Sequence, residues 1–323
     1  MAVTRKDVAR LAQVSEATVS YVMNNTKNVT PAVRERVLAA IKELNYHPNL
    51  LAKSLATNET RHVIMLVDNL QNPHYGNLMQ GAQSAAEKEG YLVSVLSSKY
   101  CSRHTMEELV SRGIDGVIMT LSSKDSDFMA DLNIPMVPGD DNLRIDYHQA
   151  IQDMTSAFQR LGHKNIAFLS GLPLSIGNPR YFSFQESLQK YGLNQDPALI
   201  VDGNGSTDER AGYAAADELL KRKIPFTGVF AINDLMAIGA MKCFWDKGLH
   251  VPEDISICGC DAIESASYTL PPLSTINSNP FQLGEGLMYR MVSMLHPERD
   301  LPQKNVVVSA SFVQRASMGQ API

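Results

Sequence analysis

The chain has 323 residues, of which 44% are hydrophobic, and its formal net charge is −5. This length predicts two or three domains with sizeable cores. No apolar run approaches the length of a membrane span, and none follows the charged residues at the N-terminus, which argues against a membrane protein and against a signal peptide. We therefore expect a protein of the cytoplasm with no membrane partner.

The charge is unevenly distributed along the chain. Residues 1–60 contain eight Lys or Arg and five Asp or Glu, a net charge of +3, which leaves −8 for the remainder. A mildly basic first segment on an acidic body fits local contact with phosphate groups. The signal is weak by itself, because many neutral domains carry a similar local excess.

Four cysteines stand at positions 101, 243, 258 and 260. None forms a Cys-x-x-Cys pair, and residues 258–260 fall in a predicted buried strand. We therefore expect reduced, buried thiols, with no disulfide framework, no metal site and no cofactor.

Two short helices joined by a tight corner are predicted over residues 4–24. Thr4 caps the first helix with Asp7 as its capping-box partner, and Ser15 caps the second after a corner at Gln13 and Val14. This pattern is typical of a helix-turn-helix whose second helix enters the major groove of DNA, the alternative being two amphipathic helices of an ordinary bundle. The facing apolar residues are Val8, Leu11, Ala12, Val19, Val22 and Met23.

The outer face of the second helix is left for DNA. We expect Glu16 to accept from a cytosine amino group, Ala17 to touch a thymine methyl group, and Tyr21 to offer its ring and hydroxyl to a base. The other predicted DNA contacts, mostly to phosphates and backbone, are Thr4, Ser15, Thr18, Ser20, Asn24, Thr30, Tyr46, Asn49, Ala52, Lys53 and Leu55.

A third helix is predicted from residue 31 to about residue 44. Thr30 caps it and Pro31 occupies its first position. Its predicted buried stripe is Val33, Val37, Leu38, Ile41 and Leu44. A further helix at residues 50–56 has only about two turns, and so short a helix is marginal in water without packing partners. The alternative for residues 50–56 is a linker with a chance apolar face.

From residue 61 onward, short apolar strands alternate with amphipathic helices, which predicts α/β architecture with parallel sheets and helices on both faces. The alternation is long enough for two lobes. Strands are expected at 63–67, 91–96, 116–119, 166–169, 199–201, 228–231 and 255–258. Helices are expected at 78–88, 106–111, 150–160, 181–190, 210–221 and 235–247.

Polar residues follow several of these strands. Ligands of open parallel sheets bind beyond the carboxyl ends of strands, so a small polar ligand is expected in an interlobe cleft. Simpler roles stay open: Asn233 and Asp234 as helix caps, Asp261 as a turn residue, Arg180 as a surface ion-pair partner, and His74 facing solvent.

The chain closely resembles the LacI/GalR family of bacterial transcription regulators, and the resemblance extends nearly to the C-terminus. It implies an all-α helix-turn-helix head and a two-lobed α/β effector domain like a periplasmic binding protein. It also implies a homodimer, a palindromic double-stranded DNA operator, a small-molecule effector and, as a rule, repression. The matching motifs are residues 7–9, 14–15, 18–20, 44–46, 48–49 and 52–55.

The resemblance also implies the division of the chain. Residues 1–48 form the head, and residues 49–60 form the hinge helix and linker. The N-terminal lobe comprises 61–148 and 278–304, and the C-terminal lobe comprises 149–277 and 305–323. In the family the hinge helix pairs with its dimer mate and a leucine, here Leu55, wedges into the central base step, which favours flexible steps such as CG.

In the body, residues 72–75 are similar to a family loop whose aromatic residues line the effector pocket. Arg180 matches the effector-clamping arginine, and Asp261 matches the acidic residue that accepts hydrogen bonds from the effector. The effector would change the orientation of the lobes and hence the spacing of the hinges. The predicted effector contacts are His74, Tyr75, Arg180, Thr207, Asn233, Asp234 and Asp261.

The chain also departs from the family pattern. The stretches 96–106 and 121–145 look short, and Thr207 stands where an aromatic lid is common. A sugar-like or other metabolite is expected, and its identity stays open. The alternative is a regulator of the same fold that is independent of effector or controlled by a protein partner. An enzyme is not expected, because no phosphate-binding glycine loop and no nucleophile elbow is present.

Overall fold

The structure is a computed structural model that describes residues 3–25, 27–47, 54, 59–120, 129–137, 144–174, 178–203, 205–301 and 307–322. The chain divides into two compact units, Met1–Thr60, which we call the head, and Arg61–Ile323, which we call the body. Within the described ranges no helix combines the length and the apolar character that crossing a bilayer requires.

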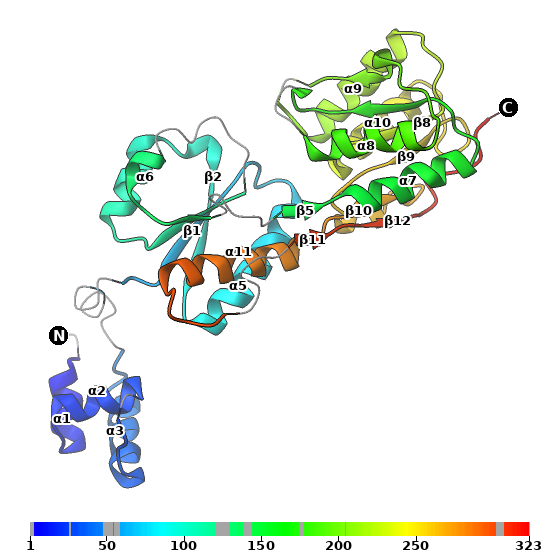
Figure 1. The fold of residues 1–323 in the computed structure, drawn as a ribbon. Coiled ribbons are helices and arrows are strands. Elements are labelled where there is room, and N and C mark those ends of the chain that lie inside the picture. Colours follow the sequence, from blue (N-terminus) through cyan, green and yellow to red (C-terminus); the bar gives the residue numbers. More distant parts are fainter. Residues whose placement is uncertain are drawn as a thin grey trace. The chain divides into compact units, whose positions relative to one another are not determined.

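The head contains the three predicted helices, α1 (Arg5–Ala12), α2 (Glu16–Asn24) and α3 (Pro31–Glu43) (Figure 1). The capping box of α1 is confirmed, because the Thr4 hydroxyl accepts from the Asp7 N–H at 3.4 Å and Asp7 Oδ2 accepts from the Thr4 N–H at 3.0 Å. Ser15 caps α2 by accepting from the Thr18 N–H at 3.1 Å. These local hydrogen bonds satisfy helix-start donors that would otherwise lack partners.

The core of the head corrects part of the predicted apolar pattern. Leu11 and Leu38, predicted to face inward, are 42% and 50% exposed. Small alanines on α1 and α3 take the buried positions instead, and their size lets the helices approach closely. Thr30 precedes α3 without making a capping hydrogen bond, although Pro31 occupies the first turn as predicted. The core comprises Val8, Ala9, Ala12, Val19, Val22, Val37, Ala40 and Tyr46.

The first sheet of the body is parallel, with strand order β2-β1-β3-β4. Its strands are β1 (His62–Val67), β2 (Leu92–Ser97), β3 (Gly116–Met119) and β4 (Met136–Val137). Alternate residues of β1 face opposite sides. Val63 and Met65 pack with α5 (Pro73–Glu89) and α11 (Pro280–Leu295), whereas Ile64 packs with α6 (Arg103–Ser111). Helices therefore cover both faces, as predicted.

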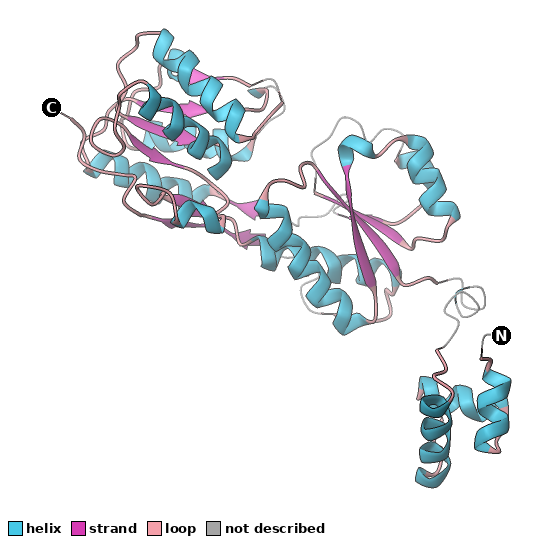
Figure 2. Cartoon of the chain, turned by 180° about the vertical axis from the view of Figure 1, so that it is seen from behind, coloured by secondary structure: helices cyan, strands magenta, loops and turns pink. Residues whose placement is uncertain are grey.

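The second sheet is also parallel, with the equivalent order β7-β6-β8-β9. Its strands are β6 (Ile166–Leu169), β7 (Ile200–Val201), β8 (Gly228–Ala231) and β9 (Ser256–Cys258). Helix α7 (His148–Arg160) packs with α8 (Pro179–Lys190), and α9 (Glu209–Lys221) packs with α10 (Asp234–Asp246) (Figure 2). In both sheets the strand order reverses beside the first strand, and ligands bind at the carboxyl ends of strands near such points.

Short strands and one long helix join the two sheets. Strand β5 (Arg144–Asp146) pairs in parallel with β11 (Val307–Ser309), and β10 (Thr275–Asn277) pairs antiparallel with β12 (Ser311–Val313). Between β10 and β11 the chain forms α11, which lies beside α5 (Figure 1). These four strands and α11 were not among the elements predicted from the sequence. The predicted boundaries of the two lobes stay a prediction.

Glycines set the distance between α5 and α11. A Cβ at Gly81 would lie 1.9 Å from the backbone oxygen of Phe281, and a Cβ at Gly284 would lie 1.9 Å from that of Leu78. The two backbones are therefore closer than any side chain allows at these positions.

Helical 3-10 turns complete the described secondary structure at Ser98–Tyr100, Ala130–Leu132, Pro197–Leu199 and Glu264–Ser267.

All four cysteines are free thiols. Cys243, Cys258 and Cys260 are buried as predicted, whereas Cys101 is only partly buried, because it follows a surface turn at the end of β2. Burial raises the pKa of the Cys258 thiol well above its ordinary value, and this keeps the group protonated.

Candidate DNA-reading face and ligand site

The outer face of α2 is available to a partner. Glu16 and Ala17 are exposed in its first turn, and Ser20 and Tyr21 are half-buried on the next. Val19 and Val22 point the opposite way into the core of the head. The arrangement presents short and polar side chains at the N-terminal end of a helix, which is how recognition helices meet base edges.

Lys27 is a further candidate that sequence reasoning missed. Its ammonium group lies 4.7 Å from the centroid of the Tyr21 ring, within the range of a cation–π contact. The chain turns back after α2 because Asn25 adopts a left-handed conformation at φ 54°. A signal was present in the sequence, since Lys27 is the one basic residue between α2 and α3. The contact adds positive charge beside a predicted base-reading residue.

Several predicted phosphate contacts already hold internal hydrogen bonds. The Thr4 hydroxyl donates to Asp7 Oδ2 at 2.6 Å, and the hydroxyls of Ser15 and Thr18 lie 2.9 Å apart. Asn24 donates to the Ser20 hydroxyl at 3.2 Å. Tyr46 is buried in the core of the head. Asn49, Ala52, Lys53 and Leu55 lie outside the described residues, as does the predicted hinge helix apart from Ser54.

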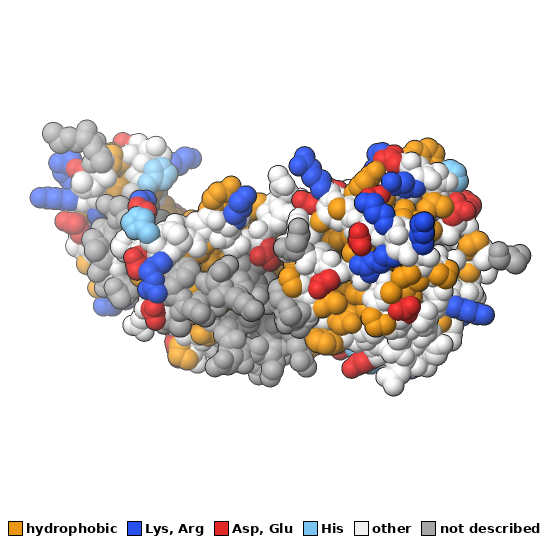
Figure 3. All heavy atoms as spheres, turned by 90° about the horizontal axis from the view of Figure 1, so that it is seen from above, with side chains coloured by type: hydrophobic (Ala, Val, Ile, Leu, Met, Phe, Trp, Pro, Cys, Tyr) orange, Lys and Arg blue, Asp and Glu red, His pale blue; other side chains and the backbone are white. Residues whose placement is uncertain are grey.

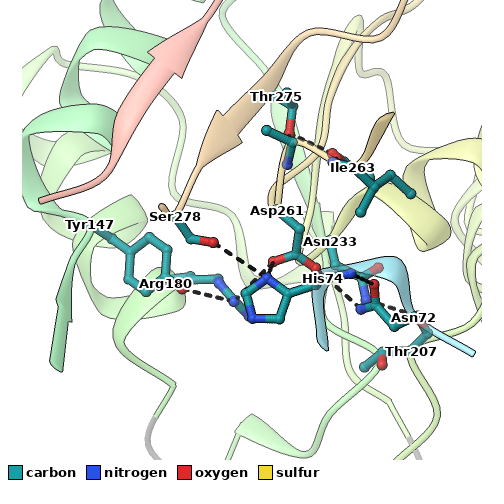
Figure 4. A network of polar contacts seen from close by, with 12 residues as sticks. Asn72, His74, Tyr147, Arg180, Thr207, Asn233, Asp261, Ile263, Thr275 and Ser278 are labelled. Atoms are coloured by element: carbon teal, nitrogen blue, oxygen red, sulfur yellow. Dashed lines mark hydrogen bonds and ion pairs between the residues drawn. The ribbon is translucent and has the colours of Figure 1, made fainter. Parts of the chain in front are cut away.

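In the body, polar side chains converge on the buried carboxylate of Asp261 (Figure 4). Its Oδ2 accepts from Asn72 Nδ2 at 3.3 Å, and its Oδ1 accepts from Arg180 Nη2 at 3.4 Å. His74 Nδ1 lies 3.5 Å from the same Oδ1. Asp261 is therefore more than a turn residue. All three contacts are long for hydrogen bonds, so the carboxylate keeps capacity to accept from a ligand.

Arg180 is held from one side by a residue that sequence reasoning missed, Tyr147. Arg180 Nη2 donates to the Tyr147 hydroxyl at 2.9 Å, and the guanidinium carbon lies 4.8 Å from the centroid of the Tyr147 ring. Arg180 Nε is buried and has no hydrogen-bond partner among the described residues. Arg180 is therefore not a surface ion-pair residue. An unpaired buried N–H is costly, so this donor is available to an acceptor atom of a ligand.

The backbone at Asp261 is strained. Asp261 has φ 114° and Ala262 has φ 53°, both in the region that favours glycine. Gly259, two residues earlier, meets Asp234 so closely that a Cβ would lie 2.3 Å from its Oδ1. Strained conformations of this kind persist where the surroundings hold them and often mark ligand sites.

Asn233 and Asp234 serve the protein itself. Asn233 caps α10 by accepting from the Met236 N–H at 2.9 Å and donates to the Thr207 carbonyl at 2.9 Å. Asp234 is fully buried, and its oxygens accept from the Ile263 N–H at 2.9 Å and the Thr275 hydroxyl at 2.5 Å. Both oxygens of Asp234 therefore bind other parts of the protein, and its predicted ligand contact stays a prediction.

His74 and Tyr75 lie at the start of α5, beside the cluster. His74 is buried, which lowers its pKa, while the charge of Asp261 acts in the opposite direction. Its Nδ1 also lies 3.5 Å from the Ser278 hydroxyl, and its ring meets the Tyr75 ring edge to face at 5.2 Å. His74 therefore does not face solvent.

A cavity of about 360 Å³ adjoins Asp261. Of the predicted effector contacts, Asp261 alone lines it. Apart from its neighbour Ala262, the other lining residues come from α5, β10 and the start of α11 with its cap, which only the fold brings together, so sequence reasoning missed them. This volume is within the usual range of small-molecule sites. The lining residues are Asn77, Asp261, Ala262, Asn277, Asn279, Pro280, Phe281 and Gln282.

The buried carboxyl of Asp234 predicts a pH dependence of stability. Burial, together with the nearby charge of Asp261, raises the pKa of Asp234 to about 8 from an ordinary value of 3.8. Between about pH 4 and pH 8, Asp234 therefore holds a proton in the folded chain but is ionised in the unfolded chain. Its free energy of unfolding therefore falls as pH rises, by at most about 1.4 kcal/mol per pH unit. Urea denaturation across this range should show that Asp234→Asn removes this contribution.

Asp217→Asn is the matched control. Hydrogen bonds from Lys221 and Lys247 lower the pKa of Asp217 to about 2, so its loss leaves the slope between pH 4 and pH 8 unchanged. Equal slopes in the unmodified chain and in Asp234→Asn would show that Asp234 is ionised in the folded state.

Comparison with known proteins places both units. Residues 4–49 match the bacterial regulatory proteins of the lacI family, and residues 155–318 match a periplasmic binding protein-like domain. The HTH-type transcriptional repressor PurR of Haemophilus influenzae is 33% identical, over 87% of this chain and 88% of the relative. PurR of Aliivibrio salmonicida is 31% identical, over 97% and 99%.

Solved structures agree. The Lac repressor dimer bound to operator and the anti-inducer ONPF has a TM-score of 0.80 at 25% identity, covering 99% of this chain and 100% of that chain. The complex of the transcriptional regulator CelR with cellobiose has a TM-score of 0.71 at 26% identity, covering 98% and 99%. The relatives are regulators rather than enzymes, in agreement with the absence of catalytic motifs. The chain belongs to the lacI family of bacterial regulatory proteins and is a DNA-binding transcriptional repressor.

Proposed function

We propose that this repressor binds a palindromic operator as a homodimer and that a small polar effector, bound at Asp261, controls its affinity for DNA. The proposal of an effector site is supported by the polar cluster at Asp261, whose hydrogen-bonding capacity is not fully satisfied. Asp261 accepts only long hydrogen bonds, and Arg180 Nε is buried without a partner among the described residues. Polar groups left in this state favour a ligand that completes their hydrogen bonds.

On the DNA side, α2 lies in the major groove, with Glu16, Ala17 and Tyr21 at base edges. Lys27 holds the Tyr21 ring and supplies charge toward the phosphates. In the proposed complex the hinge segments of two protomers pair in the minor groove and Leu55 wedges into the central step. The operator is then two half-sites around a flexible central step such as CG.

Exposed apolar surface supports a dimer. A groove of about 620 Å³ on the body is lined by residues of α10 and of the two segments at 249–253 and 269–271. At this groove Trp245 is 66% exposed and Leu270 is 94% exposed. The edge strand β2 adds Leu92, 62% exposed. On the face drawn in Figure 3, charged side chains of both signs are interspersed with hydrophobic ones. Exposed apolar side chains at a groove favour contact with a partner, and homodimers commonly form by a two-fold contact between copies.

The relatives indicate the kind of effector. One solved relative holds cellobiose and another, from Enterococcus faecium, holds ribose. We infer that the effector of this chain is likewise a small polar metabolite. In this proposal effector and operator act on one shared equilibrium between relative orientations of the two lobes. Each therefore changes the affinity of the protein for the other by the same factor.

The first test is selection of random duplex DNA by the full chain. We expect enrichment of a palindrome with a central CG step. Leu55→Ala should weaken its binding, and a chain that begins at residue 61 should select nothing. Glu16→Ala should relax preference at one position of each half-site, at a cost of about 1–3 kcal/mol. A selected site without two-fold symmetry would contradict the proposed dimer.

The dimer surface is tested by Leu270→Asp. A charge placed at the apolar groove must be desolvated on association, so the mass measured by sedimentation equilibrium should shift from dimer toward monomer. Phe182→Asp, at a side chain on α8 that is 53% exposed, is the matched control and should leave the dimer intact. An unchanged mass for Leu270→Asp would place the contact elsewhere.

The effector site is tested by a thermal shift screen against sugars, purines and phosphorylated metabolites. A compound that raises the melting temperature should lose about ten- to a hundred-fold in affinity in Arg180→Ala, because hydrogen bonds to a charged group contribute about 1.5–3 kcal/mol. Arg160→Ala, at an exposed arginine on α7, is the control. A stabilising compound that is insensitive to Arg180→Ala binds at another site. If no compound stabilises the chain, the effector-independent alternative is favoured.

A further inference from the structure

The chain enters the body at Arg61 in a strained conformation. Arg61 is the first residue of the body and directly precedes β1. Its φ of 56° lies in the left-handed region, which is costly for a residue that carries a Cβ. The residue is exposed, so packing in the core does not explain this conformation. Strained backbone of this kind persists only where its surroundings hold it, and it often marks a functional position.

Hydrogen bonds hold the backbone of Arg61 on both sides. The Arg61 N–H donates to Asp115 Oδ2 at 2.6 Å, a short bond that the negative charge of the carboxylate strengthens. The Arg61 carbonyl accepts from the Leu92 N–H at 2.8 Å. Asp115 is held in turn, because its own N–H donates to the His62 carbonyl at 2.8 Å. The peptide groups before and after Arg61 are therefore both fixed to the first sheet.

The side chain of Arg61 lies against a region that several elements stabilise. Its guanidinium carbon is 5.9 Å from the centroid of the Tyr91 ring, and a Cβ at Gly90 would lie 3.0 Å from its Nη1. Tyr91 is buried, and its hydroxyl lies 2.9 Å from Nε2 of His296, directly after α11. The entry point of the chain is thus held by residues next to the end of α5, the start of β2 and the end of α11.

This entry point lies close in the sequence to the predicted DNA contacts. Four residues, 57–60, separate Arg61 from the predicted hinge helix at residues 50–56. Four residues span at most about 14 Å when fully extended. The position and direction in which the chain leaves the body therefore limit where a hinge helix can lie. In a dimer this limit applies to both protomers, so it bears on the distance between the two hinge helices.

We propose that Asp115, through its hydrogen bond to the Arg61 backbone, is a positioning residue for operator binding, which sets the direction of the linker and thereby the half-site spacing that the dimer prefers. Asp115 contacts neither DNA nor effector in this role. If Asp115 served stability alone, its loss would lower the melting temperature and leave the preferred spacing unchanged. The inference rests on the proposed dimer and adds to it a residue that determines the geometry of its complex with DNA.

The test compares two operators in the binding of the full chain, measured by fluorescence anisotropy. One operator has the selected spacing, and the other has one base pair inserted at its centre, which separates the half-sites by about 3.4 Å more and rotates them by about 35°. We expect the unmodified chain to prefer the selected spacing. Asp115→Ala should lose about tenfold of this preference, since tenfold corresponds to about 1.4 kcal/mol, close to the contribution of one hydrogen bond to a charged group.

Two variants serve as controls. Asp115→Asn keeps an acceptor oxygen for the Arg61 N–H and should keep most of the preference. Asp131→Ala removes an exposed carboxylate that pairs with Arg103 at 2.7 Å, on the 3-10 turn before β4, and should leave the preference unchanged. The inference is overturned if Asp115→Ala keeps the full preference, or if Asp131→Ala reduces it equally.

A second pair of variants decides if Asp115→Ala does not fold. Arg61→Pro removes the N–H donor and holds φ near −65°, whereas Arg61→Gly keeps the donor and adopts positive φ readily. Arg61 is exposed, so neither change removes a side chain from the core. Arg61→Pro should lose the preference for the selected spacing and Arg61→Gly should keep it. Equal preferences in these two variants would contradict the role assigned to this hydrogen bond.

The failure of this inference is distinguishable from that of the proposed function. An unmodified chain that selects single half-sites contradicts the proposed dimer, and the inference falls with it. A chain that selects a palindrome with a spacing preference independent of Asp115 and of the Arg61 backbone supports the dimer and overturns the inference alone.

Discussion

The hydrogen bonds to the Asp261 carboxylate are the interaction on which the arrangement of the polar site in the body depends. It joins Asn72, 189 positions earlier at the start of α5, to Arg180 on α8. Because the group is buried, its charge requires these partners, and because the contacts are long, they leave it open to a competing donor. A ligand that binds Asp261 therefore acts directly on a contact between the two sheets' helices, which is the kind of linkage that effector control requires.

The buried Asp234 stabilises the conformation of the loop that contains Asp261. Its carboxyl binds the Ile263 N–H, inside the segment that links β9 to β10, and the hydroxyl of Thr275, the first residue of β10. Asp234 also packs closely against Gly259, two residues before the strained backbone of Asp261. The buried Asp234 thus supports the geometry of Asp261, the residue that we propose to bind the effector.

The head and the body differ in net charge, in keeping with the different partners proposed for them. The head carries +3 and presents a short helix with Glu16, Ala17 and Tyr21, which suits phosphates and base edges. The body carries −8, and its polar cluster holds one compensated arginine. The net negative charge of the body confines non-specific attraction to DNA to the head. Such attraction depends on the number of DNA phosphates that Lys and Arg side chains neutralise.

The sequence alone determined what depends on near neighbours in the chain. The capping box of Thr4 and Asp7, the cap at Ser15 and the strand–helix alternation of the body are local patterns, and all are present in the structure. Tertiary structure decided the rest. The packing of α11 on α5, the Tyr147 contact of Arg180 and the burial of Asp234 join residues tens to hundreds of positions apart. No local periodicity encodes such pairs, because which polar side chains meet is settled only when two sheets and their crossing strands are packed together.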